Sequence, residues 1–586
     1  MKSVLDLGRA LPLAACLLAA AAPSVMAAEA PPTVRDLAGL WEVSVFHGPD
    51  LRGTIVVERV ADGWRADLRG RLVAGKAGER GKVLFDFGQD RSLSFDPAKP
   101  GGAFWRQGRS DKGYNFITPV ALAAQGKARW AGEVAPLDDR LTLYLPVKVA
   151  ADGTASTFVR NPEANVGRFL NIGRVELVNG EVRLWGKPFG AQTEEVVGRG
   201  PFDPDNGVVS IYMPRVGQSY EFHRIEPGQA TGFYPRVGAV PYRYAAPPAR
   251  ADGWPVGSFE DVGISRETMQ RFVQHIIDLP VESNSTSDLH ALLIARHGKL
   301  VLEEYFHGYD RDQLHDTRSA GKSVTATLMG AAMNAGYRLS PATPVYQTMG
   351  YATDDPKKRA MTAEHLLRQT SGFFCDDSND AAPGNEDTMQ GQRAQPDWYR
   401  FALDLPMLNA PGSAPPVYCS VQPNLLGGVI ARATGKPLED LFRDLVARPM
   451  GITRYALNTQ PTGQPYGGGG LYLAPRDFMK FAQVMLAGGT WQGRRVVSEA
   501  WAKRSTDALE AFGTRQYGYL WWSQTYPYKG RQVRAFYAAG NGGQIAMAIP
   551  ELDLVICFMG GNFSDKGARV SQDVYVPDYI LPAIND

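Results

Sequence analysis

Short runs of alternating apolar and polar residues dominate the chain from residue 31 to about residue 245. This alternation is typical of strands with one buried face. It recurs at 40–47, 53–60, 141–149, 175–184 and 208–213. Turn sequences such as Asn179-Gly180 accompany the runs, and few stretches have helical spacing. The pattern predicts an all-β accessory domain over residues 31–245, a barrel or a sandwich, that serves packing or substrate positioning.

The pattern changes after a Pro-rich stretch at 241–255, which predicts a linker. Residues 289–306 predict two strands around a His297-Gly298 turn. The run 324–335 is almost entirely small and apolar, as is typical of a buried helix. Helical patterns continue to about residue 450 and return at 476–488.

Strand patterns return near the end of the chain, before a predicted closing helix at 574–584. They lie at 517–524, 532–538, 544–549 and 554–559. Strands at both ends with helices between them predict an α+β domain over residues 255–586. In this domain we expect an antiparallel sheet with flanking helices and a helical subdomain.

The charge balance does not favour a surface for nucleic acid or anionic lipid. The 586 residues contain 62 Lys and Arg against 61 Asp and Glu, a net charge of +1. Such a balance provides no field of one sign to hold an anionic polymer. We therefore expect a small-molecule partner and no nucleic acid. The length also requires more than one hydrophobic core.

The N-terminus has the order of a signal peptide. Lys2 and Arg9 precede an apolar run at 10–22, and small residues follow around position 27. We expect cleavage near residue 28 and export to the periplasm or the medium. A lipoprotein signal is the alternative, but Cys16 lies in the middle of the apolar run instead of at its end. No later apolar stretch is long enough to span a bilayer, so no membrane span is expected in the mature chain.

One motif carries candidate chemistry: Ser319 and Lys322 form an S-x-x-K pair at the start of the predicted buried helix. Residues three apart share a helix face, so the ammonium can reach the hydroxyl. The helix N-terminus also favours a developing oxyanion. Ser319 is therefore the candidate nucleophile and Lys322 its activator. The tripeptide Gly321-Lys322-Ser323 resembles the end of a phosphate-binding loop, but that loop requires a glycine where Asp316 stands.

The cysteines permit one disulfide in an exported protein. Cys16 belongs to the predicted signal peptide, and Cys375, Cys419 and Cys557 remain. The candidate pair is Cys375–Cys419, and three buried thiols are the equal alternative. No His or Cys pair has metal-ligand spacing, and the chain contains only 8 His. We therefore expect neither a metal site nor a cofactor.

Several further segments resemble one protein family. The segment 292–306, LLIARHGKL followed by Glu-Tyr-Phe, is similar to the hairpin that precedes the family's serine. The segment 363–372, AEHLLRQTSG, and the Gly-rich segment 467–471 are similar to elements that follow it. In this order, residues 255–586 resemble the serine β-lactamase and penicillin-binding-protein superfamily, especially its class C-like esterases and amide hydrolases. The resemblance implies a β-lactamase-like catalytic domain.

The resemblance includes a second catalytic loop, which is Tyr-x-Asn in the family and Tyr418-Cys419-Ser420 here. It implies that Tyr418 takes the proton from Ser319 and later passes it to the leaving group. A phenol is a poor base unless a cation stabilises its phenolate, and Lys322 would supply that cation. Ser420 replaces the family's Asn, so it is a candidate substrate contact with altered selectivity.

The family's third element is a Lys-Thr-Gly or His-x-Gly strand, and residues 538–540 match it best. Gly540 and Gly542 would let a substrate lie close to the backbone. The N–H of Asn541 would join that of Ser319 as the oxyanion hole. A plain Gly-rich turn between two strands is the alternative. No cation stands at the family's Lys or His position, which disfavours β-lactams and is compatible with esters or small amides.

The sequence therefore predicts an exported serine hydrolase that cleaves ester or amide bonds through an acyl-enzyme on Ser319. A β-lactamase or D-amino-acid peptidase acting on cell-wall-like substrates is one alternative. A catalytically silent binding protein of the same fold is the other, because the second and third motifs are altered.

Overall fold

The computed structural model describes residues 31–46, 51–108, 115–137, 140–215, 217–238 and 240–585. The predicted signal peptide, residues 1–28, lies outside the described residues. Within the described ranges, no helix is long and apolar enough to cross a membrane.

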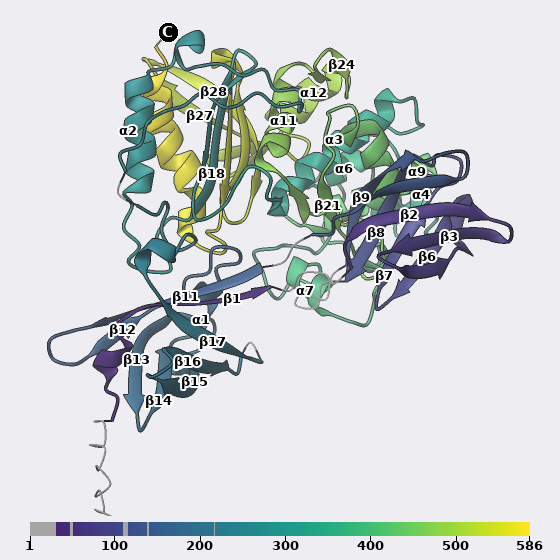
Figure 1. The fold of residues 1–586 in the computed structure, drawn as a ribbon. Helices are drawn as coiled ribbons and strands as arrows, with labels where there is room; N and C mark the ends of the chain where they lie inside the picture. Colours follow the sequence, from purple (N-terminus) through teal and green to yellow (C-terminus); the bar gives the residue numbers. More distant parts are fainter. Residues whose placement is uncertain are drawn as a thin grey trace, which may run out of the picture.

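Part of the N-terminal half forms a closed, eight-stranded barrel (Figure 1). Its strands are β1 (Gly39–Phe46), β11 (Arg140–Val149), β12 (Ala155–Thr157), β13 (Ile172–Val178), β14 (Glu181–Gly186), β15 (Glu195–Asp203), β16 (Val208–Met213) and β17 (Gln218–Ile225). Alternate residues such as Trp41, Leu184 and Ile211 point inward and are fully buried. The barrel confirms the all-β prediction and explains the alternating pattern.

A second β unit is inserted between β1 and β11 (Figure 1). Its strands are β2 (Gly53–Val60), β3 (Gly63–Leu68), β4 (Arg71–Ala74), β5 (Lys76–Ala77), β6 (Val83–Gly88), β7 (Arg91–Phe95), β8 (Gly102–Gly108), β9 (Asn115–Ala124) and β10 (Arg129–Val134). It has a core of its own around Phe85, Phe87 and Trp105. The described part of residues 31–245 thus contains the predicted barrel and a second β unit that the sequence did not indicate, because each sheet buries a separate apolar face.

The inserted unit is continuous with the C-terminal half. Strand β9 pairs with β21 (Tyr455–Asn458), with Ile117 opposite Leu457. Strand β21 in turn pairs with β22 (Leu471–Leu473), and β22 pairs with β20 (His315–Asp316) just before Ser319. A line of paired strands therefore connects the inserted unit to the segment that carries the candidate nucleophile.

Residues 255–585 form the predicted α+β domain around an eight-stranded antiparallel sheet. In sheet order the strands are β19 (Lys299–Tyr305), β18 (Leu289–Arg296), β30 (Leu554–Gly560), β29 (Gln544–Ile549), β28 (Arg531–Gly540), β27 (Trp522–Tyr528), β26 (Arg515–Tyr517) and β25 (Glu510–Phe512). Helices α2 (Arg266–Ile277) and η9 (Ser571–Ile580) share one apolar core with the sheet. Helices α3 (Gly321–Asn334) and α11 (Pro475–Leu486) share the other.

Both faces of the sheet are covered, so its central strands are not amphipathic. In β18, Leu292 and Ile294 pack into one core while Leu293 and Ala295 pack into the other. All eight residues of β18 are buried. This explains the continuous apolar run there, which contrasts with the alternation in the barrel.

The prediction of one strand over 517–524 is wrong. Strand β26 ends at Tyr517 and β27 begins at Trp522. Between them Leu520 has a φ of 60°. The Leu520 carbonyl accepts a hydrogen bond from Ser323 Oγ at 2.5 Å. The Leu520 N–H donates to the Leu367 carbonyl at 3.1 Å. The backbone between β26 and β27 therefore bonds to other elements, at a point where the apolar pattern shows no interruption.

Candidate active site

Ser319 lies on a tight turn, η5 (Arg318–Ala320), that leads into α3. Arg318 has a φ of 50°, in the left-handed region that residues with a side chain seldom adopt. The Asp316 carboxylate stabilises this conformation, because it accepts from Arg318 N at 2.8 Å and pairs with Arg318 Nε at 3.0 Å. Asp316, which stands where a phosphate-binding loop needs glycine, therefore stabilises the turn that carries Ser319.

Lys322 is inside the protein and in contact with Ser319. Its Nζ donates to Ser319 Oγ at 2.8 Å, and the residue is 1% exposed. Burial by itself lowers the pKa of Lys322, but electrostatic interactions with Tyr418, Glu386 and Asp377 outweigh burial and raise the pKa. Lys322 is therefore a buried ammonium beside a partly exposed serine.

Tyr418 faces the same ammonium. Lys322 Nζ lies 5.0 Å from the centroid of the Tyr418 ring. The Tyr418 ring also stacks on Trp522, with ring centroids 5.7 Å apart. Trp521, the preceding residue, is fully buried. The structure thus brings Ser319, Lys322 and Tyr418 together from two segments about one hundred residues apart.

The loop that carries Tyr418 is fixed from the 369–377 region. A disulfide joins Cys375 to Cys419, with Cα atoms 5.9 Å apart. The Gln369 side chain accepts from Cys419 N at 3.0 Å. Ser420 is fully buried, and its Oγ donates to the Asp377 carboxylate at 2.6 Å. The hydroxyl of Ser420, a predicted substrate contact, is thus directed to a protein carboxylate.

The end of β28 lies against the Ser319 turn. A Cβ atom on Gly540 would be 2.2 Å from the Thr317 carbonyl oxygen and 3.2 Å from Ala320 N. Only glycine allows this approach. Asn541 follows at the exposed edge, where its Oδ1 accepts from Ser564 N at 2.9 Å.

Gly542 completes the turn after β28. It has a φ of 93°, and it forms a β-bridge with Asn562. A Cβ atom there would be 2.7 Å from the Phe563 ring. The barrel touches the same place, since Asn165 Nδ2 donates to the Phe563 carbonyl at 3.0 Å. The barrel therefore supports the turn that contains Asn541.

A buried group of titratable residues joins the barrel to the α+β domain. Asp288 lies 3.3 Å from Arg160 of the barrel, 3.3 Å from His290 and 3.4 Å from His307. Burial raises the pKa of Asp288, but Arg160 and the histidines outweigh it and hold it well below its usual range. Burial lowers the pKa of His307, and likewise that of His315, to about 3. These residues are spread over 155 positions, so no local motif could have indicated the group.

A large cavity lies beside the site, between the barrel, the inserted unit and the α+β domain. Its volume is about 960 Å³, and Glu163, Pro119 and Arg318 line it from these three parts. Arg318, the residue before Ser319, thus lines a cavity that the barrel and the inserted unit also line.

Comparison with known proteins agrees with these features. Residues 290–570 match the β-lactamase family. This part of the chain belongs to the serine β-lactamase and penicillin-binding-protein superfamily. The match confirms the resemblance carried by the motifs. Ser319, Lys322, Tyr418 and Asn541 all lie inside it, whereas the barrel and the inserted unit lie outside.

The similar proteins each match only part of this chain. A 6-aminohexanoate-dimer hydrolase from Paenarthrobacter ureafaciens is 27% identical over 253 residues, which are 40% of this chain and 63% of that protein, less than two thirds of its length. A solved structure of a putative 6-aminohexanoate-dimer hydrolase from Bacillus anthracis has 19% identity and a TM-score of 0.42, covering 49% of this chain and 76% of that one. EstCE1, titled a hydrolase with promiscuous acyltransferase activity, has 17% identity and a TM-score of 0.42, covering 55% and 98%.

Proposed function

We propose that the protein is an exported serine hydrolase that cleaves an ester or amide bond through an acyl-enzyme on Ser319. The observation that carries the proposal is the 2.8 Å contact between the buried Lys322 ammonium and the Ser319 hydroxyl. An ammonium beside a serine, with a tyrosine ring facing it, is suited to moving the serine's proton. Membership of the superfamily supports the same chemistry.

The proposed reaction has two steps. Tyr418, as a phenolate stabilised by Lys322, takes the hydroxyl proton while Ser319 Oγ attacks the carbonyl carbon. The N–H groups of Ser319 and Asn541 stabilise the oxyanion, and Tyr418 passes the proton to the departing oxygen or nitrogen. The same pair then activates water, which attacks the acyl-enzyme, releases the acid and restores Ser319.

Esters and small amides fit the site better than β-lactams. Ala538 stands where the family has the Lys or His that recognises a β-lactam carboxylate. The printed name of the Paenarthrobacter ureafaciens relative, a 6-aminohexanoate-dimer hydrolase, supports including amides. A panel of p-nitrophenyl esters, 6-aminohexanoate dimer, D-alanyl peptides and nitrocefin separates these classes by kcat/KM.

The decisive experiment is active-site labelling. A fluorophosphonate should react with the wild-type protein, and mass spectrometry should place the adduct on Ser319. Ser319→Ala should lose labelling and turnover. Ser323→Ala is the matched control, because Ser323 is a buried serine on the same helix whose hydroxyl donates to Leu520, and it should label normally. Full activity in Ser319→Ala, or a wild-type protein without adduct or turnover, would reject the proposal.

Export is a separate part of the proposal. The signal-like order of residues 1–28 supports it, and a disulfide is favoured in oxidising compartments. Fractionation of a Gram-negative host that expresses the full chain, followed by intact-mass measurement, should find protein without about the first 28 residues outside the cytosol. Uncleaved cytosolic protein would reject export and leave the hydrolase assignment standing.

A further inference from the structure

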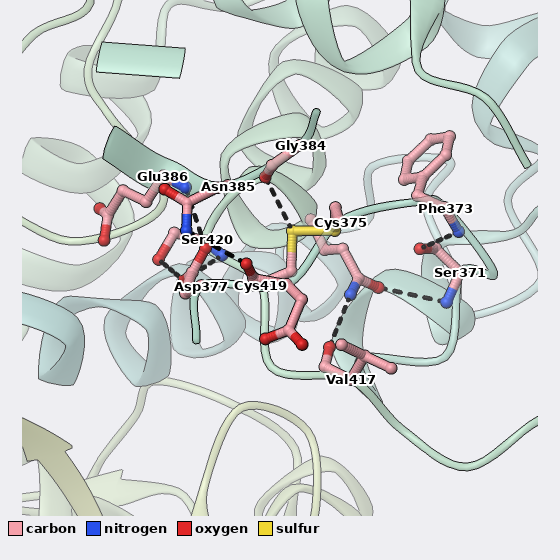
Figure 2. Close-up of a disulfide and its surroundings, with 12 residues drawn as sticks. Ser371, Phe373, Cys375, Asp377, Gly384, Asn385, Glu386, Val417, Cys419 and Ser420 are labelled. Carbon is pink, nitrogen blue, oxygen red and sulfur yellow. Dashed lines mark hydrogen bonds between the residues drawn. A yellow bond between two sulfur atoms is a disulfide. The ribbon is translucent and has the colours of Figure 1, made fainter. Parts of the chain in front are cut away.

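Three consecutive residues of the loop that carries Tyr418, residues 418–420, are each bonded to one short segment, 375–377. Asp377 N donates to the Tyr418 carbonyl at 3.1 Å. The disulfide joins Cys419 to Cys375. Ser420 donates to Asp377 Oδ2 through its N–H at 2.8 Å and its hydroxyl at 2.6 Å. Figure 2 shows the Asp377 carboxylate directed to Ser420 beside the disulfide. Movement of Asp377 therefore moves the segment that carries Tyr418.

The Asp377 carboxylate accepts from a second element as well. Its Oδ1 accepts from the backbone N–H of Glu386 at 3.1 Å, at the start of α7 (Glu386–Gly391). Ser420 is the residue before α9 (Val421–Thr434). An ionised carboxylate can accept all three hydrogen bonds, whereas a protonated one carries an O–H that must donate. The hydrogen bonds that fix the loop carrying Tyr418 therefore depend on the charge of Asp377.

The groups around Asp377 come from several elements. Lys322 of α3 attracts its charge, and Glu386 of α7 repels it. Tyr418 and Tyr466 also lie in this group, and Tyr466 donates to Glu386 at 2.6 Å. Burial raises the pKa of Asp377 to about 6, while Lys322 and the hydrogen bonds from Ser420 act in the opposite direction. The carboxylate thus changes charge within a pH range that an assay can cover.

We propose that Asp377 is a positioning residue whose ionised carboxylate holds the Tyr418 loop against Lys322. It makes this contact through Ser420, which stands where the family has an amide side chain. The inference rests on the proposed function, because that function gives Tyr418 its part in proton transfer. When Asp377 gains a proton, the loop loses an acceptor and Tyr418 loses its fixed distance from Lys322 and Ser319.

The test measures kcat and KM for a p-nitrophenyl ester between pH 5 and pH 8. Wild-type kcat should fall as the pH drops through about 6. Asp377→Asn should lower kcat at pH 8 about tenfold, because misplaced catalytic groups lose rate steeply. Its KM should stay within about twofold, and the inflection near pH 6 should disappear. Asp376→Asn is the matched control, since Asp376 accepts from Ser378 N in its own loop, and it should retain wild-type values.

Ser420→Ala keeps the proposal testable if Asp377→Asn does not fold. Removing the hydroxyl removes a hydrogen bond that lowers the pKa of Asp377, so the inflection should move to higher pH. An unmoved inflection in Ser420→Ala, or a wild-type rate and inflection in Asp377→Asn, would overturn the inference. Labelling separates the two claims. If Ser319 is labelled but the Asp377 variant behaves as wild type, only the positioning role fails, whereas an unlabelled wild type removes the function itself.

Discussion

Gly540 provides the sharpest test of how the site is built, because a single added methyl group would push strand β28 away from the Ser319 turn. In Gly540→Ala the added Cβ would lie 2.2 Å from the Thr317 carbonyl oxygen, whereas ordinary contacts lie at 3.4–4 Å. The obstacle is backbone, so β28 and the Ser319 turn must separate by about 1 Å. A misplacement of about 1 Å can cost about 10²-fold in rate, or about 2.7 kcal/mol of activation free energy.

The assay compares kcat, KM and guanidinium unfolding for Gly540→Ala and Gly391→Ala. Gly391 is at the end of α7, and a Cβ atom there would have no neighbour within 4 Å, so that variant should match wild type. Gly540→Ala should lose about 100-fold in kcat and about 1–3 kcal/mol of stability from overpacking. A folded Gly540→Ala protein with kcat within about threefold of wild type would refute the view that β28 and the Ser319 turn form one reaction site.

Two further predictions concern buried charges. Lys322→Met should lower kcat/KM of the folded protein for the ester about 10³-fold; it should also lower the free energy of unfolding, because the Asp377 and Glu386 carboxylates lose their buried cation. A folded variant with a tenth of the wild-type rate would contradict the role of Lys322. Buried titratable groups should also affect how the free energy of unfolding depends on pH between about pH 5 and about pH 6. In this window the unfolded chain protonates His307 and His315 and the native state does not, which lowers stability as the pH falls; native Glu163 and Asp377, whose pKa values burial raises to about 7 and about 6, retain protons that the unfolded chain lacks, which opposes the fall. Glu163→Gln removes one opposing group, so its free energy of unfolding, measured by guanidinium unfolding at several pH values, should fall about 1.4 kcal/mol per pH unit more steeply than that of the wild type, and equal slopes would contradict the raised pKa of Glu163.

The candidate Ser319–Lys322 pair could be recognised from sequence because its geometry is local. Ser319 and Lys322 are three residues apart at the start of a helix, and helical geometry alone brings them within hydrogen-bonding distance. The strands of the barrel were found for a similar reason, since alternation reports one buried face. The break at Leu520 was missed because the backbone there bonds to Ser323 and Leu367, which lie far away in the sequence.

Other parts of the site depend on contacts that no local pattern contains. Asp377 is two residues from one disulfide cysteine, but only the structure shows that Ser420 and Glu386 donate to its carboxylate. The charged group around Asp288 draws on the barrel and on residues that flank β18 and β19 of the α+β domain. Periodicity likewise indicated strands over residues 31–245 without indicating which strands pair.

The sequence by itself determined the fold class, the superfamily resemblance and the Ser319–Lys322 pair, because each follows from periodicity or from spacing within one element. Only the tertiary structure decided that the chain passes from β1 into a second β unit before it returns to the barrel at β11. The same is true of the end of β28, which lies against the Ser319 turn, and of the hydrogen bonds from Ser420 to Asp377. These features join residues tens to hundreds of positions apart. Their positions are set by which apolar faces pack together and which buried polar groups find partners, and both are properties of the whole folded chain.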